Sequence, residues 1–257
     1  QIRHIFALTE EARIRGFEDS RIFRWRGDLW CSSTVLDTPP VDVCKIVLAR
    51  VPEAGGEMDE WKVLEARFGG REQRHEKNWM PASDGGNGLA FVYSLDPLKV
   101  VEIERDASWL ALPDGPADWA ADHLRGGTQV VYDGDQRLCC VHEVVYVGGR
   151  RAYLHRFAGW GRTGFFVSRP FTLLGERIEF ACGLAIHGDE VILTFGSEDN
   201  KAWIAKIALQ EVRDSLRDVR PRARPKRNLP EWSLFANQET NRALRTRAAA
   251  DRAVSLL

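Results

Sequence analysis

The chain has 257 residues, a formal net charge of −1 and nine tryptophans, and this length allows one large domain with a substantial core. The balanced charge provides no bulk attraction for nucleic acid or for an anionic membrane surface. No apolar run approaches the roughly 20 residues that a membrane-spanning helix needs, so we expect neither a nucleic-acid partner nor a membrane span.

One unit occurs four times along the chain. Each copy has a short polar cluster, an apolar strand, a glycine-centred turn and a second apolar strand. The turn glycines are Gly27, Gly86, Gly134 and Gly188, and a period of about 50 residues is typical of β-propeller blades. We therefore predict an all-β fold, a β-propeller in which the inner strands converge on one axis, so that distant polar clusters share a pocket.

Strand patterns follow one another from Phe17 to about Leu209, after a charged lead-in over 1–16. Alternation of apolar and polar residues predicts outer strands over 43–48 and 61–68. A further tight turn is expected at Gly148-Gly149. Before residue 200 only 117–124 has a pattern compatible with an amphipathic helix, which argues against a parallel βαβ fold.

The character of the sequence changes after Leu209. The apolar spacing over 210–219 predicts a short helix, and 220–227 form a basic run broken by prolines. We interpret that run as a solvated linker, with binding to a phosphate-rich partner as the alternative. Residues 234–257 read as a helix that serves as an arm, an oligomer contact or the start of a further domain. We thus divide the chain into a propeller domain, 1–209, and a C-terminal helical extension, 210–257.

Four hairpins with their outer strands amount to about four blades, and a closed ring must join the first blade to the last. The first repeat begins at residue 18, so little chain remains upstream. Either a ring of four or five blades closes in an unusual way, or an N-terminal portion of a five-bladed propeller is missing.

Five cysteines occur, an odd number without a Cys-x-x-Cys pair, which argues against a disulfide framework and against structural zinc. They are Cys31, Cys44, Cys139, Cys140 and Cys182. Most fall on strand patterns, where we expect small buried apolar side chains. A reducing compartment fits this usage, so we predict a cytoplasmic location, no metal and no cofactor.

The first polar cluster is Glu18-Asp19-Ser20-Arg21. On a regular strand Glu18 and Asp19 would point to opposite sides, so that one acid faces the axis and the other pairs locally with a partner such as Arg21. The axial acid is either a general acid in a pocket or a strand-entry residue that binds backbone amides.

The second and third clusters add cations. In His75-Glu76-Lys77-Asn78-Trp79, Lys77 suits a phosphate or a sugar hydroxyl, and a surface charge run is the alternative. In Arg125-Gly126-Gly127-Thr128-Gln129, the two glycines would let backbone approach a ligand while Arg125 forks onto an anion. An ordinary turn is the alternative there.

The third and fourth hairpins add further candidates. A lone strand histidine such as His142 is more often structural than catalytic. Glu179 precedes the fourth hairpin and Asp199 follows it, where each acid either binds sugar hydroxyls or caps a turn. No dinucleotide fingerprint, P-loop or nucleophile elbow is present.

Taken in order, these motifs resemble glycoside hydrolase family 130, which contains β-mannoside phosphorylases and related hydrolases on a five-bladed propeller. Glu18-Asp19-Ser20-Arg21 resembles the family's Glu-Asp-Pro-Arg motif. Phe180–Leu184 and Leu193–Asp199 resemble its Phe-x-Cys-Gly and Tyr-Gly-Ala-Ala-Asp segment, and Glu76–Trp79 resembles its Lys-Asp element near the phosphate site.

The resemblance implies an enzyme that cleaves or transfers mannosides or similar glycosides with inversion. Asp19 would be the general acid, acting through a substrate hydroxyl, and inorganic phosphate would be the co-substrate. Such chemistry needs a cationic pocket for phosphate opposite the acid. Lys77, Arg125 and His142 are the candidates for that pocket, and the sugar would be held by Glu18, Arg21, Asn78, Glu179 and Asp199.

The sequence also departs from the family pattern. Ser20 stands where the motif has proline, Tyr93-Ser94 stand where a His-Arg pair is expected, and the family's closely spaced phosphate-binding arginines are not plainly matched. Three hypotheses therefore stand: a glycoside phosphorylase, hydrolase or glycosyltransferase-like enzyme; a non-catalytic glycan-binding propeller, one module of a longer polysaccharide-biosynthesis protein; and a protein-interaction propeller.

Overall fold

The computed structural model describes residues 15–36, 43–64, 75–103, 110, 121–162 and 164–219. Strands dominate these residues and one short helix accompanies them, so the predicted all-β class is confirmed. The chain divides into two compact units. The first unit comprises Gln1–Tyr93 with Lys99–Leu110, and the second comprises Ser94–Leu98 with Ala111–Leu257.

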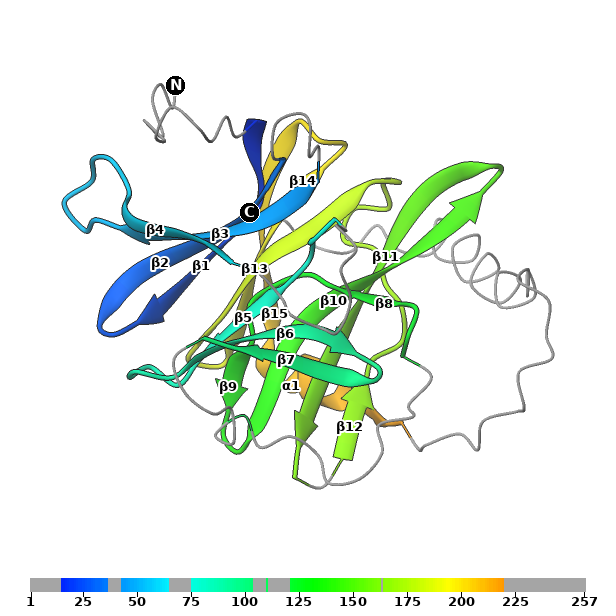
Figure 1. Ribbon diagram of the computed structural model, residues 1–257. Helices are drawn as coiled ribbons and strands as arrows, with labels where there is room; N and C mark the ends of the chain where they lie inside the picture. Colours follow the sequence, from blue (N-terminus) through cyan, green and yellow to red (C-terminus); the bar gives the residue numbers. More distant parts are fainter. Residues whose placement is uncertain are drawn as a thin grey trace. The chain divides into compact units, whose positions relative to one another are not determined.

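The described strands form four sheets, and each sheet contains the hairpin of one sequence repeat (Figure 1). The first sheet has the order β1 (Arg15–Trp25), β2 (Asp28–Leu36), β3 (Cys44–Val51) and β4 (Asp59–Leu64), and the second has β5 (Met80–Ser83), β6 (Leu89–Leu95) and β7 (Leu98–Glu102). The third contains β8 (Leu124–Gly126), β9 (Val131–Asp133), β10 (Gln136–Val147), β11 (Arg150–Gly161), β12 (Gly164–Val167) and β16 (Arg217–Asp218), and the fourth has β13 (Glu179–His187), β14 (Glu190–Ser197) and β15 (Lys201–Ala208).

All four glycine-centred hairpins predicted from the sequence are confirmed, and the pairs are antiparallel. A hairpin at Gly148-Gly149 also joins β10 to β11 as predicted. The ring closure and the number of blades remain predictions. The expected strand over 61–68 begins earlier, as β4, and its residues 65–68 lie outside the described part.

The first hairpin shows why this repeat folds as it does. Arg26 and Gly27 both have positive φ, 55° and 83°, as a tight turn matched to strand twist requires. Alternation then buries Phe23 and Trp25 on one face while Ile22 stays exposed. The Trp30 ring packs 4.6 Å from the Trp25 ring, and its indole N–H donates to the Trp25 carbonyl.

Most tryptophans of the described residues belong to the core. Trp25, Trp30, Trp79 and Trp160 are all buried. The five cysteines are free, and four of them are buried with Cys182 partly exposed. The burial of the cysteines agrees with their interpretation as apolar packing groups.

The segment between β8 and β9 crosses close to two other strands. A Cβ atom on Gly127 would lie 2.4 Å from the Cys140 carbonyl oxygen and 3.1 Å from that of Ala181. The Thr128 hydroxyl accepts from the Cys140 amide at 2.9 Å. The Gln129 side chain donates to the Leu184 carbonyl and accepts from its amide. Gly127 therefore allows close approach to neighbouring strands of the fold, and a role of the glycine pair in ligand approach stays a prediction.

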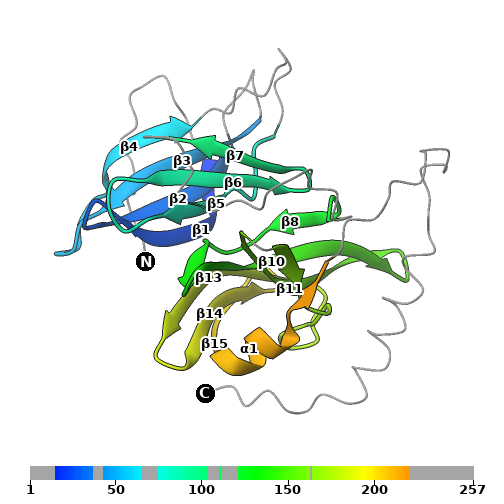
Figure 2. The same cartoon turned by 90° about the horizontal axis from the view of Figure 1, so that it is seen from below.

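The helix predicted over 210–219 is present as α1 (Leu209–Ser215), which lies beside β14 and β15 (Figure 2). It is shorter than predicted, because residues 217–218 form a strand. Its Leu209 and Val212 belong to the buried cluster of the second unit, together with Leu193 and Phe195. The strand that follows, β16, pairs with β12. The first part of the 210–257 segment is thus packed into the second unit, whereas 220–257, with the basic run and the expected last helix, lies outside the described residues.

We predict that Gly127→Ala lowers the free energy of unfolding by about 2–3 kcal/mol, because the new methyl group meets fixed backbone oxygens. Urea denaturation measures this. Gly161→Ala is the matched control in the same sheet, since its nearest heavy atoms would lie at 3.7 Å, ordinary contact. Equal losses in the two variants would contradict this account of the crossing.

Candidate functional site

The candidate general acid lies at an irregularity of β1. Glu18 pairs with Thr34 and Arg21 pairs with Ser32, so two residues, Asp19 and Ser20, stand opposite one residue of β2. This is a β-bulge, which re-aims side chains and breaks the alternation of a strand. Asp19 has φ 54°, a left-handed conformation that Asp tolerates better than most residues. The bulge interrupts the regular alternation on which the expectation of opposite faces for Glu18 and Asp19 depends.

Arg21 supports this bulge from within. It is 1% exposed, and its Nη1 donates to the Asp19 carbonyl oxygen at 2.6 Å. The Ser20 and Ser33 hydroxyls, 2.8 Å apart, join the bulge to β2. Arg21 therefore acts on the main chain of the candidate acid from a buried position, instead of standing open to a sugar.

In the second cluster, His75 and Glu76 are bonded to other parts of the fold, whereas Lys77 is exposed. The Cys44 amide donates to His75 Nδ1 at 3.1 Å, and the Glu76 amide donates to the Cys44 carbonyl at 2.9 Å. Glu76 is buried and accepts from the Trp79 indole N–H at 3.1 Å.

Lys77 and Asn78 lie between the anchored residues. Lys77 Nζ lies 3.4 Å from Glu18 Oε2, an ion pair between two of the predicted clusters. Partial burial lowers the pKa of Lys77, but nearby Cys44 and Glu18 outweigh it and raise that pKa above its ordinary value. Asn78 is half-buried with φ 62°. The first unit thus brings Glu18 and Lys77 together, with Asp19 and Asn78 beside them in sequence.

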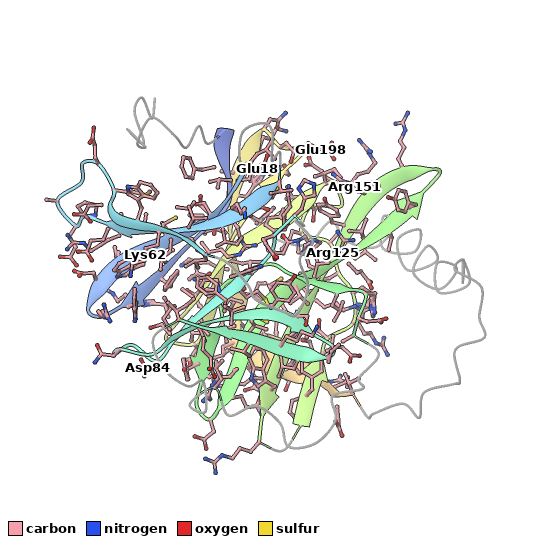
Figure 3. All side chains as sticks on the ribbon, viewed as in Figure 1. Glu18, Lys62, Asp84, Arg125, Arg151 and Glu198 are labelled. Carbon is pink, nitrogen blue, oxygen red and sulfur yellow. The ribbon has the colours of Figure 1, made fainter. Side chains whose placement is uncertain are left out.

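In the second unit, Arg125 on β8 stands directly opposite His142 on β10. Arg125 is exposed (Figure 3), whereas His142 is buried, its ring 5.1 Å from both the Tyr153 and the Phe180 rings. Two of the three residues predicted for a cationic pocket are therefore neighbours on adjacent strands. His142 lies under an aromatic cover.

Glu179 precedes Phe180 but has a different role. It is 0% exposed, and its two carboxylate oxygens accept from the amides of Leu173, Leu174 and Glu176 at 2.6–2.8 Å. Burial raises the pKa of Glu179, although these amides lower it. Of the two alternatives from the sequence, this geometry is that of an acid that caps a loop.

Asp199 lies in the turn between β14 and β15. It is exposed with φ 55°, and Glu198 before it has φ 47°. Glu198 Oε1 accepts from the Ile178 amide, and Oε2 lies 3.5 Å from Arg177 Nη2. The turn is thereby joined to the residues just before Glu179, while the Asp199 side chain stands at the surface.

One ion cluster was not proposed from the sequence. Glu143 is buried on β10, and its carboxylate lies 3.1 Å from His123 Nε2 and 3.1 Å from Arg156 Nη2. Burial raises the pKa of Glu143, but His123 and Arg156 outweigh it and hold that pKa below its usual value. His123 follows no motif, and only the register of β8, β10 and β11 brings these three residues together.

His155, opposite His142 on β11, is 1% exposed. Its Nε2 accepts from the Ala181 amide at 3.2 Å, so the ring must be neutral to keep this bond. Burial lowers the pKa of His155 from 6.5 to about 4. This histidine is a structural link between β11 and β13.

The surface also has a depression that contains none of the predicted site residues. An open depression of about 580 Å³ is lined by Asp133, Gly134, Asp135, Gln136, Phe166, Arg213 and Leu216. Within the described ranges, no group of three or more His, Cys, Asp and Glu side chains is placed to hold a metal ion. No described helix has the length and apolarity to cross a membrane.

Several solved structures are similar to the chain, among them an arabinanase and a phosphorylase. One is an alpha-L-arabinanase from Cellvibrio cellulosa complexed with arabinohexaose, with a TM-score of 0.43, 10% identity and coverage of 74% of this chain and 73% of that chain. The other is a mannose phosphorylase from Leishmania mexicana in complex with phosphate ion, with a TM-score of 0.36, 11% identity and coverage of 86% and 92%. No protein-family model matches the chain, and the search of curated proteins finds no match.

We predict that acid destabilises the fold partly through His155. Between pH 6.5 and about 4, the His155 ring is protonated in the unfolded chain but stays neutral in the folded protein. The free energy of unfolding therefore decreases as the pH falls through this range. The loss attributable to His155 reaches about 3 kcal/mol.

Urea denaturation across this pH range checks the prediction. In His155→Gln, whose amide oxygen can still accept from Ala181, the pH dependence should be shallower by that amount. The exposed His187 provides the control variant His187→Gln, which should keep the wild-type slope. An unchanged slope in His155→Gln would refute the assignment.

Proposed function

We propose that the protein is a carbohydrate-active propeller that cleaves or transfers mannosides or similar glycosides with inversion, and that Asp19 is its general acid. The observation that supports this most directly is the bulge in β1. Asp19 is held there in a left-handed conformation while buried Arg21 binds its carbonyl oxygen. Backbone strain of this kind concentrates at functional sites, and a general acid needs a fixed position.

The proposed reaction follows from the residue types. Asp19 delivers its proton through a substrate hydroxyl to the leaving oxygen as the bond from the anomeric carbon to that oxygen breaks. A phosphate oxygen forms the new bond on the opposite face, which inverts the configuration. In a hydrolase, water would form this bond and would lose its proton to a second carboxylate that acts as general base. Cations held in fixed positions stabilise the negative charge on the phosphate and on the leaving oxygen in the transition state. Lys77, Arg125 and His142 are proposed for that role, with inorganic phosphate as co-substrate.

The five residues expected to hold the sugar differ in burial and in bonding, so we propose different roles for them. Glu18 and Asp199 are exposed and Asn78 is half-buried, so we propose these three for sugar hydroxyls. Arg21 and Glu179 are buried and bind main-chain groups of the fold. We propose that they position the residues beside them, Asp19 and Phe180.

A non-catalytic glycan-binding module is the second candidate, and one observation favours it. Tyr93 and Ser94 stand where the family pattern has a His-Arg pair. The Tyr93 ring packs 5.6 Å from the Trp79 ring, and the Ser94 hydroxyl donates to the Pro97 carbonyl. Neither residue offers a cation for phosphate. Binding of a mannoside without any release or uptake of phosphate would support this candidate.

We predict that Asp19→Asn lowers turnover by about 10²–10⁴-fold, because the amide cannot donate a proton as an acid does. A panel of mannosyl donors and acceptors, tested with and without inorganic phosphate, should be scored for both free sugar and sugar 1-phosphate. Asp28→Asn, in the same hairpin and 3.7 Å from Arg50, is the matched control and should retain activity. Full activity in a folded Asp19→Asn protein would overturn the role of Asp19.

A further inference from the structure

One face of the sheet that β8, β10 and β11 form gathers two arginines, two histidines and two tyrosines. Residues directly opposite on paired strands point to the same face, and alternate residues share that face. The register places Tyr146 opposite Arg151, Val144 opposite Tyr153, and His142 opposite both His155 and Arg125. We call these seven residues the cationic face.

The outer part of the cationic face is open. Tyr146 is 58% exposed, and Arg151 and Arg125 are exposed as well; both arginines are labelled in Figure 3. The Arg151 guanidinium lies 5.2 Å from the centre of the half-buried Tyr153 ring. The cationic face therefore presents a tyrosine, an arginine stacked on a second tyrosine, and a further arginine.

The two faces of this sheet differ in charge. The cationic face contains no acidic residue at its seven positions. On the other face, Val145, Ala152 and Leu154 form a small buried cluster, and Glu143 is paired with Arg156. Arg150, the neighbour of Arg151, stands opposite Val147 on this second face.

We propose that the cationic face binds an anionic glycan, a chain of sugars that carry carboxylates. The arginines would fork onto the carboxylates, and the tyrosine rings would lie against the apolar faces of the sugars. The open part of the cationic face on β11 runs from Arg151 to Tyr153, about 7 Å along the strand, while His155 is buried. This inference rests on the proposed glycan activity and narrows its substrates, from mannosides or similar glycosides, to glycans that carry carboxylates.

Titration of the full-length protein with polygalacturonate and with neutral mannan, followed by calorimetry, tests the proposal. Polygalacturonate should bind more tightly than mannan, and its binding should weaken as sodium chloride screens the charges. Arg151→Gln should weaken it about tenfold, the value of a charge-assisted contact. Arg150→Gln, which removes the same charge from the opposite face, should change it by less than about twofold.

Several outcomes would overturn the proposal: equal effects of the two arginine variants, equal affinity for mannan, or tighter binding of single-stranded DNA than of polygalacturonate. The DNA result would indicate a nucleic-acid surface instead. Asp19→Asn should keep wild-type affinity for polygalacturonate, because Asp19 is not part of the cationic face. Loss of turnover and loss of binding therefore report separately on the general acid and on the substrate class.

Discussion

The second unit depends on the place where the chain crosses from β8 to β9. There the Thr128 hydroxyl and the Gln129 amide bind main-chain groups of Cys140 and Leu184, which belong to strands of two different sheets. Gly127 permits the approach because it has no Cβ. These side-chain bonds add to the backbone bond from the Thr128 amide to the Cys140 carbonyl, so directional contacts fix this joint. The position of β8, and of Arg125 on it, follows from this joint.

The repeat was visible in the sequence because it is local. Strand alternation and turns such as Arg26-Gly27 depend on residues a few positions apart, so the hairpins could be predicted. The need for glycine at position 127 could not be predicted, because it comes from the Cys140 carbonyl oxygen, which lies near Gly127 only in the folded chain. The short strand β16 was also missed, because its two residues pair with β12 and have no pattern of their own.

The sequence identified which types of residue could form the site, but it did not reveal the role of each one. The pairing of Glu18 with Lys77 shows that two of the predicted clusters do meet within the first unit. Arg21 and Glu179 carry the charges expected of ligand-binding groups, yet they are buried against main-chain partners, and composition cannot distinguish these two uses of a charge. The cluster around Glu143 escaped notice because its members have no fixed spacing along the chain and meet only through strand register.

The partial exposure of Cys182 has a practical consequence. The other four cysteines are buried, so a thiol-reactive fluorophore added to the folded protein would attach first to Cys182. This residue lies on β13, two positions after Phe180, whose ring covers His142. The wild-type chain thus offers its own attachment point for an optical reporter beside the candidate cations, with no engineered cysteine required.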